Sequence, residues 1–220
     1  MDALVAAGAA AARGAPALRV AIVPTAVGRH RPDLAVAHAQ GAFHAAAERA
    51  GVAAQVEAVN LLRREDATDR ASVATLEAAH VVHLPGGDPD LLPAVLRATP
   101  AWAAILHSLE RGACLAGASA GAMALAERLW TPGGPVDGFG LVPGIAVLPH
   151  YVGSRLDGWR RIVDPDRRLA WLGLEEQTLV LGRPGEPWHV AGRGRAFLVP
   201  AGAGEATISA GPGETIDLPA

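Results

Sequence analysis

The sequence contains no lysine and only one cysteine. All 19 basic residues other than histidine are arginine, which excludes a lysine nucleophile, a lysine Schiff base and a phosphate-loop lysine. The lone cysteine, Cys114, cannot form an internal disulfide or a cysteine cluster for zinc. Phosphate-loop, dinucleotide-binding and metal-ligand motifs are also missing from the sequence, so we expect no metal and no other cofactor.

The sequence also has little net charge and lacks long apolar runs. The net charge is -3 and the pI is about 6.2, which argues against binding to nucleic acid or to a membrane surface. No run is long and apolar enough to span a bilayer. Asp2 stands where a secretory leader carries positive charge, and Arg13 interrupts the Ala-rich run that follows. We expect a cytoplasmic protein, either a monomer or a homodimer.

Short β-branched runs alternate with helical patterns over the first part of the 220 residues. The segments that predict strands are 18–26, 54–62, 81–87 and 113–118. The segments that predict helices are 32–51, 72–80, 88–96, 99–112 and 120–129, with Ser72 as an N-cap and with Asp90 and Thr99 near two of the starts. Such alternation is typical of crossover units, so we expect a parallel sheet in a layered α/β domain.

The pattern changes after Trp130. Residues 130–140 have the composition of a loop, 141–151 resemble a strand, and 155–172 are helical in part. From residue 172 the chain is β-rich, with strand patterns at 172–182, 188–200 and 205–218 between Gly/Pro turns. No repeat or low-complexity linker divides the chain, so we expect one domain over residues 1–220.

The most informative stretch is Gly117-Ala-Ser119-Ala-Gly121, which lies between an expected strand and an expected helix. A serine on such a turn can point its hydroxyl into a crevice at the carboxyl end of a parallel sheet, where a strained backbone leaves no room for larger neighbours. Helix N–H groups close to the serine can hold a developing oxyanion. Ser119 is therefore a candidate nucleophile, and the alternative is a tight-turn serine that N-caps the helix.

Several separated segments resemble one family of enzymes. "HLPGGDP" precedes "GASAGAM", and "GLVPGIAVLPHY", "GLEEQTLVLG" and "WHVAGRGRAFLV" follow it, in the order found in the dipeptidase E and cyanophycinase family of serine peptidases. The resemblance spans roughly residues 18 to 200. It implies a three-layer α/β/α sandwich with a mainly parallel sheet, a nucleophile elbow and a β-rich C-terminal part, related to class I glutamine amidotransferases.

The same resemblance implies catalytic roles. Ser119 would be the nucleophile, and His150, at the end of an expected strand, would be its general base. Glu176 matches the acid that fixes the imidazole tautomer in the cyanophycinase-type segment. Asp137 is the rival acid, because dipeptidase E proper takes its acid from that region.

The oxyanion hole would use the backbone N–H groups of Gly87 and Ala120, because a glycine lets the backbone approach a tetrahedral intermediate. The alternative for Gly86-Gly87 is a plain turn at the end of a strand. Cys114, on the strand before the elbow, is expected in the core and not as a displaced nucleophile.

Two departures from the cyanophycinase pattern argue against cyanophycin, a β-linked Asp-Arg polymer, as substrate. Pro89 stands where that pattern has Gln, and Leu148 stands where it has Asp. The resemblance leaves a short peptide, by family analogy a dipeptide with N-terminal Asp.

An acidic substrate residue needs a cation. Arg155, Arg160 and Arg161 follow His150 and could supply one, although a solvated helix face is the alternative. The residues expected to touch the substrate are Asp88, Tyr151 and Arg155.

Three other functions stay open. One is a cyanophycinase-like peptidase. Another is an esterase of the α/β-hydrolase type, with His189 as the late histidine and Asp137 or Asp164 as the acid. The third is an amidotransferase-like binding module without catalysis, which the set Ser119, His150 and Glu176 argues against.

Overall fold

The computed structural model describes residues 1–203 and 207–219. The chain divides into two compact units, Met1–Gly121 and Ala122–Ala220. The expectation of one domain over residues 1–220 stays a prediction.

The first unit contains a parallel sheet of four strands in the order β2-β1-β3-β4. The strands are β1 (Leu18–Ile22), β2 (Ala54–Ala58), β3 (Val81–Leu84) and β4 (Cys114–Gly117). Because all four strands are parallel, their carboxyl ends lead into loops at one edge of the sheet. That edge carries η1 (Pro24–Val27) after β1, the Gly86-Gly87 pair after β3 and Ser119 after β4.

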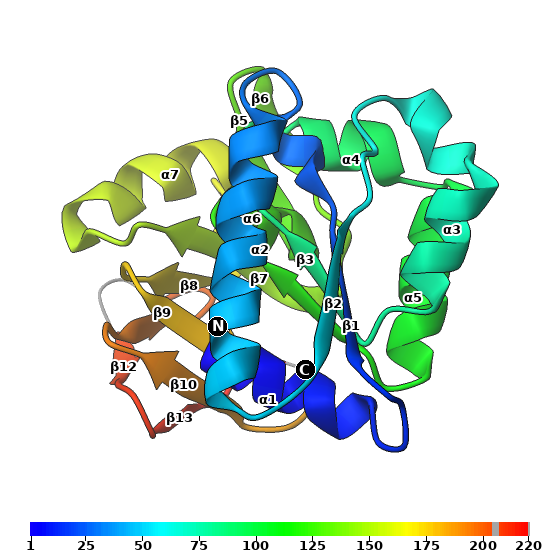
Figure 1. Ribbon diagram of the computed structural model, residues 1–220. Helices are drawn as coiled ribbons and strands as arrows, with labels where there is room; N and C mark the ends of the chain where they lie inside the picture. The colour runs from blue at the N-terminus through cyan, green and yellow to red at the C-terminus, as the bar shows by residue number, and fades with distance from the viewer. Residues whose placement is uncertain (204–206, 220) are drawn as a thin grey trace. The chain divides into compact units, whose positions relative to one another are not determined.

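Helices cover both faces of this sheet. α1 (Asp2–Ala11) and α2 (Pro32–Arg49) pack together on one face, and α3 (Arg70–Glu77) and α5 (Pro100–Glu110) pack together on the other (Figure 1). The short helices η2 (Arg64–Thr68) and α4 (Leu91–Leu96) connect these elements. The expected layered α/β architecture with a parallel sheet is therefore confirmed, and α1 is an addition that the sequence patterns did not predict.

Capping chemistry sets the helix boundaries in this unit. Pro32 occupies the first turn of α2, and Gly51, with a φ of +65°, follows its end. The Thr99 hydroxyl accepts a backbone N–H of α5, as its position predicted. The prediction of Ser72 as an N-cap was wrong: the Asp69 carboxylate caps α3 and accepts the Ser72 N–H at 2.8 Å.

The second unit is β-rich and holds two sheets. The six-stranded sheet has the order β12-β11-β8-β7-β5-β6, and the three-stranded sheet has the order β13-β10-β9. The strands are β5 (Ala126–Thr131), β6 (Gly134–Asp137), β7 (Val142–Pro149), β8 (Ala170–Leu174), β9 (Thr178–Leu181), β10 (Trp188–Gly192), β11 (Ala196–Val199), β12 (Ile208–Ala210) and β13 (Thr215–Ile216). In the six-stranded sheet, β7 pairs in parallel with both β5 and β8, and the other pairs are antiparallel.

One amphipathic helix packs on this six-stranded sheet. α7 (Leu156–Val163) follows η3 (Gly153–Arg155) and buries Leu156 and Val163 against Leu148 and Trp171. The other face of the same sheet packs Ile145, Leu172 and their neighbours into a second cluster. These two clusters hold the carboxyl ends of β7 and β8 in place.

Two expectations about this region need correction. α6 (Ala120–Leu125) ends four residues earlier than expected, because residues 126–129 belong to β5, which pairs with β6 and β7. The Ala- and Leu-rich sequence favours a helix locally, but sheet pairing overrides that propensity. The expected loop over 130–140 is in part a hairpin between β5 and β6. Of the expected strand pattern at 205–218, Glu205 and Ala206 lie outside the described residues.

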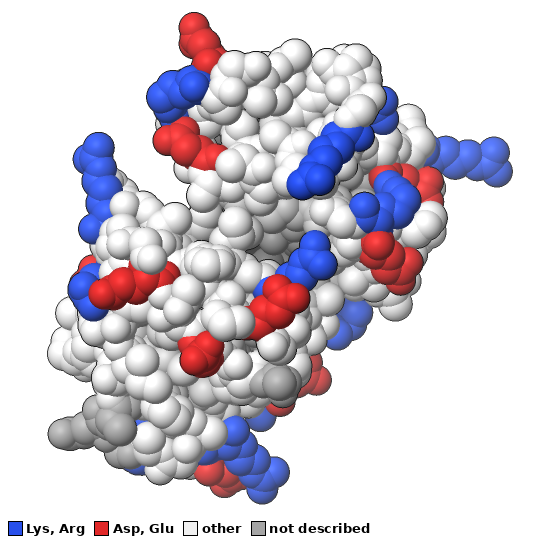
Figure 2. All heavy atoms as spheres, turned by 90° about the horizontal axis from the view of Figure 1, so that it is seen from below, with Lys and Arg blue, Asp and Glu red and all other residues white. Residues whose placement is uncertain are grey.

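Charged side chains are spread over the surface in Figure 2. On the face drawn there, arginine and acidic side chains are interspersed over a mostly uncharged surface. In the part of the chain that the structure describes, none of the helices has the length and hydropathy needed to cross a membrane.

Candidate active site

Ser119 lies on a strained turn between β4 and α6. Its φ is +50°, a left-handed value that few non-glycine residues adopt. The Ala118 N–H donates to the Leu84 carbonyl at 3.0 Å, and the Gly121 N–H donates to the Ala118 carbonyl at 2.8 Å. The first hydrogen bond joins the turn to the end of β3, and the second closes the turn itself.

Two glycines let other backbone approach this turn. A Cβ on Gly121 would overlap the Leu84 carbonyl, and a Cβ on Gly86 would lie 2.9 Å from the Ser119 Cβ. Gly86 is therefore in close contact with Ser119, as expected for the ends of the adjacent strands β3 and β4. This contact explains why small residues surround the serine.

The next residue, Gly87, adopts a φ of +146°, a conformation open essentially to glycine alone. A Cβ there would overlap the backbone of Ala26 in η1. The Asp88 N–H donates to the Ala26 carbonyl at 2.6 Å. Among the described residues, no hydrogen bond from the Gly87 N–H is found, so that donor is available to a ligand.

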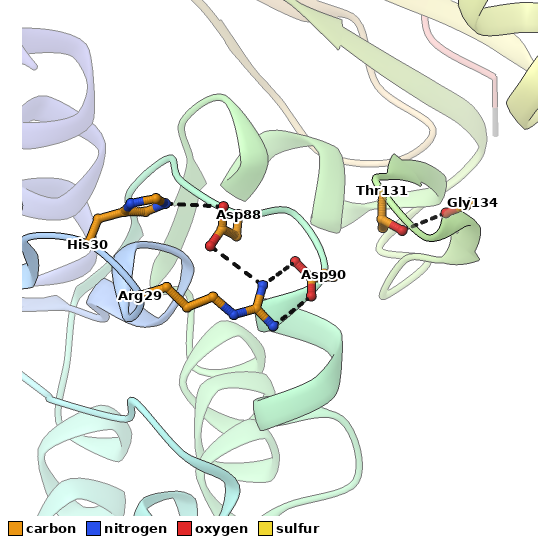
Figure 3. A network of polar contacts seen from close by, with 6 residues as sticks. All are labelled: Arg29, His30, Asp88, Asp90, Thr131 and Gly134. Carbon is orange, nitrogen blue, oxygen red and sulfur yellow. Dashed lines mark hydrogen bonds and ion pairs between the residues drawn. The ribbon is translucent and has the colours of Figure 1, made fainter.

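Four polar side chains, from this segment and from the loop after β1, contact one another beside Gly87, and sequence reasoning identified only Asp88 as a site candidate. Figure 3 shows Asp88 between His30 and Arg29, with Arg29 also reaching Asp90. His30 Nε2 lies 3.2 Å from Asp88 Oδ1, and Arg29 Nη1 lies 3.5 Å from Asp88 Oδ2. Arg29 pairs with both oxygens of Asp90 at 3.1 and 3.0 Å. The run of basic residues after the first strand, Arg29 to Arg31, could have indicated a binding site. The loop that it contacts could not be predicted, because that depends on the order of strands in the sheet.

In the second unit, His150 follows the carboxyl end of β7. It is another non-glycine residue with a left-handed backbone, at a φ of +53°. The next residue, Tyr151, donates its N–H to the Leu174 carbonyl at the end of β8, at 2.8 Å. The imidazole is about half exposed, with 54% of the side chain accessible.

His150 and Glu176 are in direct contact. Nδ1 of His150 lies 2.5 Å from Oε1 of Glu176, within hydrogen-bond distance. A carboxylate at Nδ1 holds the other ring nitrogen, Nε2, in the acceptor form that a general base needs. The structure thus brings together two of the residues expected in a triad, each from the end of a strand.

The turn that carries Glu176 packs closely against two glycines at and after the end of β10. Gln177 has a φ of +57°, and a Cβ on Gly192 would overlap its carbonyl. A Cβ on Gly194 would lie 2.7 Å from the Glu176 carbonyl. The neighbouring Glu175 carboxylate accepts the Arg195 N–H at 2.8 Å, which gives Glu175 a structural role.

The other expected site residues have different environments. Asp137 is exposed on β6, opposite Arg128 of β5. The Tyr151 ring stacks on Phe197 at 4.7 Å between centroids and packs on Gly173, so this ring is part of the sheet surface. Arg155 is exposed in η3.

Arg160 and Asp164 are largely buried and serve the local fold. Arg160 is 2% exposed and donates to the Ala203 carbonyl at 2.9 Å. The Asp164 carboxylate accepts the N–H groups of Arg168 and Leu169 at 2.8 and 3.0 Å. His189, the late histidine of the esterase alternative, pairs with Leu181 across β10 and β9.

No group of three His, Cys, Asp or Glu side chains within residues 1–203 and 207–219 is arranged to hold a metal ion. Cys114, at the start of β4, is half-buried, and burial raises the pKa of its thiol. The thiol is therefore protonated at neutral pH and a poor nucleophile.

Three comparisons relate this chain to known proteins. The model of peptidase family S51 matches residues 10–186. The cyanophycinases of Nostoc sp. (strain PCC 7120) and Trichormus variabilis are each 30% identical over 164 residues, which are 67% of this chain and 54% of each relative. The chain thus spans about half the length of the curated relatives it matches.

Two solved structures have similar folds. A peptidase from an acI-B1 Actinobacterium superposes with a TM-score of 0.76 at 26% identity, over 99% of this chain and 89% of that one. A putative peptidase E protein from Listeria monocytogenes EGD-e superposes with a TM-score of 0.52 at 18% identity, over 94% of each chain. The second likeness concerns the fold alone.

Proposed function

We propose that this chain, which belongs to peptidase family S51, is a serine peptidase that hydrolyses short peptides with Ser119 as its nucleophile. The observation that carries the proposal is the left-handed backbone of Ser119 on a strand-to-helix turn, packed against Gly86. Strain of this kind is retained where a reactive side chain must be presented. The contact between His150 and Glu176 supports the assignment of these two residues as the base and the acid of the proposed triad.

The proposed reaction passes through an acyl-enzyme. The Ser119 Oγ attacks the scissile carbonyl carbon while His150 Nε2 takes the hydroxyl proton. The tetrahedral intermediate collapses, the C–N bond breaks, and His150 returns the proton to the leaving amine. A water molecule then attacks the ester by the same route and releases the acid product and the serine. Glu176 stabilises the imidazolium in both halves without taking its proton.

The oxyanion would be held by the backbone N–H groups of Gly87 and Ala120. Gly87 supports this role because its N–H has no acceptor among the described residues and because the preceding glycine touches Ser119. Ala120 is the residue directly after the nucleophile, which supplies such a donor in serine elbows. Removal of one donor of this kind costs about 10²–10³ in kcat.

For the substrate we propose dipeptides with N-terminal Asp, taken up by a monomer or a homodimer in the cytoplasm. We assign Arg155, exposed in η3 five residues after His150, to the acidic side chain. Arg160 is unavailable for this role, because it is buried and donates to the Ala203 carbonyl. The curated relatives are cyanophycinases, so cyanophycin is the substrate to test beside dipeptides. Pro89 and Leu148 depart from the cyanophycinase pattern and favour the dipeptide.

The test is the Ser119→Ala variant, assayed beside wild type for hydrolysis of an Asp-X dipeptide and for labelling by a fluorophosphonate. We expect turnover to fall by several orders of magnitude and labelling to disappear, with an unchanged circular dichroism spectrum. Ser108→Ala is the matched control, because Ser108 is a buried serine in α5 that donates to its own helix at the Ile105 carbonyl. A Ser119→Ala variant with more than about a tenth of wild-type turnover would rule out the serine mechanism.

A further inference from the structure

We propose that Arg29 and His30 are positioning residues: together with Asp88 and Asp90 they fasten the Gly86-Gly87 loop, and through it they place the Gly87 N–H beside Ser119. This inference rests on the proposed function, since it assigns a task within the same site. It also gives Asp88 a role different from the substrate contact that its sequence position suggested.

The loop itself has little to hold it. Two successive glycines have the greatest backbone freedom, and the φ of +146° at Gly87 is not imposed by any side chain. Only contacts from neighbouring segments can select that conformation. An oxyanion donor that is displaced by about 1 Å loses much of its effect, because stabilisation depends on prior placement of the dipole.

The contacts that select the Gly87 conformation come from the loop after β1, and β1 is adjacent to β3 in the sheet. The Asp88 N–H donates to Ala26 at 2.6 Å, directly after Gly87. The Asp88 carboxylate is then occupied on both oxygens, by His30 at 3.2 Å and by Arg29 at 3.5 Å. Asp90 completes the arrangement through its two-pronged contact with Arg29. The four residues therefore join the loop after β1 to the segment that directly follows Gly87 (Figure 3).

The segment that provides these contacts is itself anchored. Thr25 in η1 is fully buried, and its hydroxyl donates to the Leu61 carbonyl at 2.7 Å. The hydrogen bond with Asp90, followed by the charges of Asp90 and Asp88, raises the pKa of Arg29, so its guanidinium stays charged. The buried Thr25 thus anchors the segment that carries Arg29, and Arg29 in turn contacts the loop beside Ser119.

Stability alone does not account for this network. The side chains of Arg29 and His30 are 57% and 60% exposed, and ion pairs at such exposure contribute little to the free energy of unfolding. Asp88 is the most enclosed member, with 27% of its side chain exposed. An exposed network beside two successive glycines fits a role in positioning the Gly87 N–H.

The experiment compares Arg29→Ala, Arg29→Lys and Asp88→Asn with the control Arg31→Ala. Arg31 lies two residues from Arg29 and pairs only with Asp33 among the contacts found for it, so it matches the charge change and leaves Asp88 untouched. For each variant we measure kcat and KM on one dipeptide, the rate of fluorophosphonate labelling, and hydrogen exchange of the Asp88 amide.

We expect Arg29→Ala and Asp88→Asn to lower kcat and the labelling rate by about 10- to 100-fold, with KM within about twofold of wild type. Exchange at Asp88 should become faster in both. Arg29→Lys should recover part of kcat, and Arg31→Ala should match wild type.

Two results would overturn the inference. One is a kcat and a labelling rate within about twofold of wild type in both Arg29→Ala and Asp88→Asn. The other is a rise in KM at constant kcat, which would make Asp88 or Arg29 a substrate contact. Failure of the proposed function is seen separately, as retained activity in Ser119→Ala, whereas the exchange rates report on the loop in either case.

Discussion

Two side chains central to the proposed site, Ser119 and His150, have backbones in the left-handed region, at φ values of +50° and +53°. Each lies just past the end of a strand, where the chain must turn sharply. A left-handed conformation at a non-glycine residue costs about 1–3 kcal/mol, which the surrounding hydrogen bonds must offset. Ala98, Arg167 and Gln177 share this conformation, so the residue-scale argument for catalysis is the combination of strain with a reactive side chain at Ser119 and His150.

The acid partner of His150 gives the first prediction. Glu176→Gln keeps the shape of the side chain but removes the charge that fixes the tautomer of His150, so kcat should fall by roughly 10²–10⁴. Glu175→Gln and Asp137→Asn should each cost less than about tenfold. The measurement is kcat of the three variants on one dipeptide, with circular dichroism for folding.

Glu175→Gln is the matched control for this prediction, because it makes the same chemical change one residue away. Its carboxylate accepts a backbone N–H of Arg195, and an amide oxygen can do the same. A large loss in Asp137→Asn beside a small one in Glu176→Gln would transfer the role of acid to Asp137.

A buried histidine in β3 gives a prediction about stability. His83 is 6% exposed and its ring meets the edge of Phe43 at 5.6 Å between centroids. Burial lowers its pKa to about 4. The unfolded chain binds a proton at this residue near pH 6.5, whereas the folded chain does not until about pH 4. The free energy of unfolding should therefore fall by about 3 kcal/mol over that interval because of His83.

This contribution is measured by denaturant unfolding of wild type and His83→Gln between pH 7 and pH 4. The glutamine stays neutral throughout, so the variant should lose less stability than wild type as the pH falls, whatever its stability at pH 7. Parallel pH profiles for the two proteins would show that His83 does not carry the effect.

At the scale of elements, the order of strands decides which loops meet. β3 lies between β1 and β4, so the Gly86-Gly87 loop is flanked by η1 on one side and by Ser119 on the other. In the second unit, β7 and β8 lie side by side, and their carboxyl ends carry His150 and Glu176. Each contact joins residues far apart in the sequence.

The connection between β10 and β11 gives a prediction at this scale. A methyl group on Gly194 would lie 2.7 Å from the Glu176 carbonyl and 2.9 Å from the Glu175 Cβ, so Gly194→Ala must displace the turn. We expect kcat to fall about tenfold or more, because the carboxylate moves relative to His150. Thermal unfolding is measured alongside kinetics.

Gly158→Ala is the control, because a Cβ on Gly158 in α7 meets open space. It should leave kcat unchanged and raise stability by up to about 1 kcal/mol, since alanine has the higher helix propensity. Equal kcat values for Gly194→Ala and wild type would show that the turn tolerates displacement.

At the scale of the whole molecule, the chain belongs to a peptidase family but spans only 54% of the length of the matched cyanophycinases. Substrate choice therefore has to be tested on the protein itself. We predict cleavage of Asp-Leu at least tenfold faster than of Ala-Leu, in kcat/KM, and little action on casein or cyanophycin. One charge-assisted hydrogen bond between an arginine and the substrate carboxylate accounts for such a ratio.

Arg155→Gln should remove that preference for Asp-Leu with little effect on Ala-Leu. Equal rates on the two dipeptides in wild type would reject the preference for an acidic residue but would not contradict peptidase activity. Faster release of product from cyanophycin than from any dipeptide would identify the alternative substrate.

The sequence by itself determined the local features of this protein. Alternating strand and helix patterns predict the parallel sheet, because burial on both faces demands short apolar strands. The small residues around Ser119 predict the turn, because no larger side chain fits a strained elbow. The segments around His150 and Glu176 predict candidates by their likeness to a family, now confirmed as the family of this chain.

Only the tertiary structure decided which distant residues meet. Periodicity carries no information about strand order, so the contact of Arg29 and His30 with Asp88 could not be derived beforehand. The closeness of Gly86-Gly87 to Ser119 was expected only through the family resemblance. Local propensity favoured a helix through residue 129, and pairing with β6 and β7 turned residues 126–129 into a strand. The sequence offered Glu176 as the acid through the family resemblance and Asp137 as its rival. Only the adjacency of β7 and β8 places Glu176 2.5 Å from the imidazole.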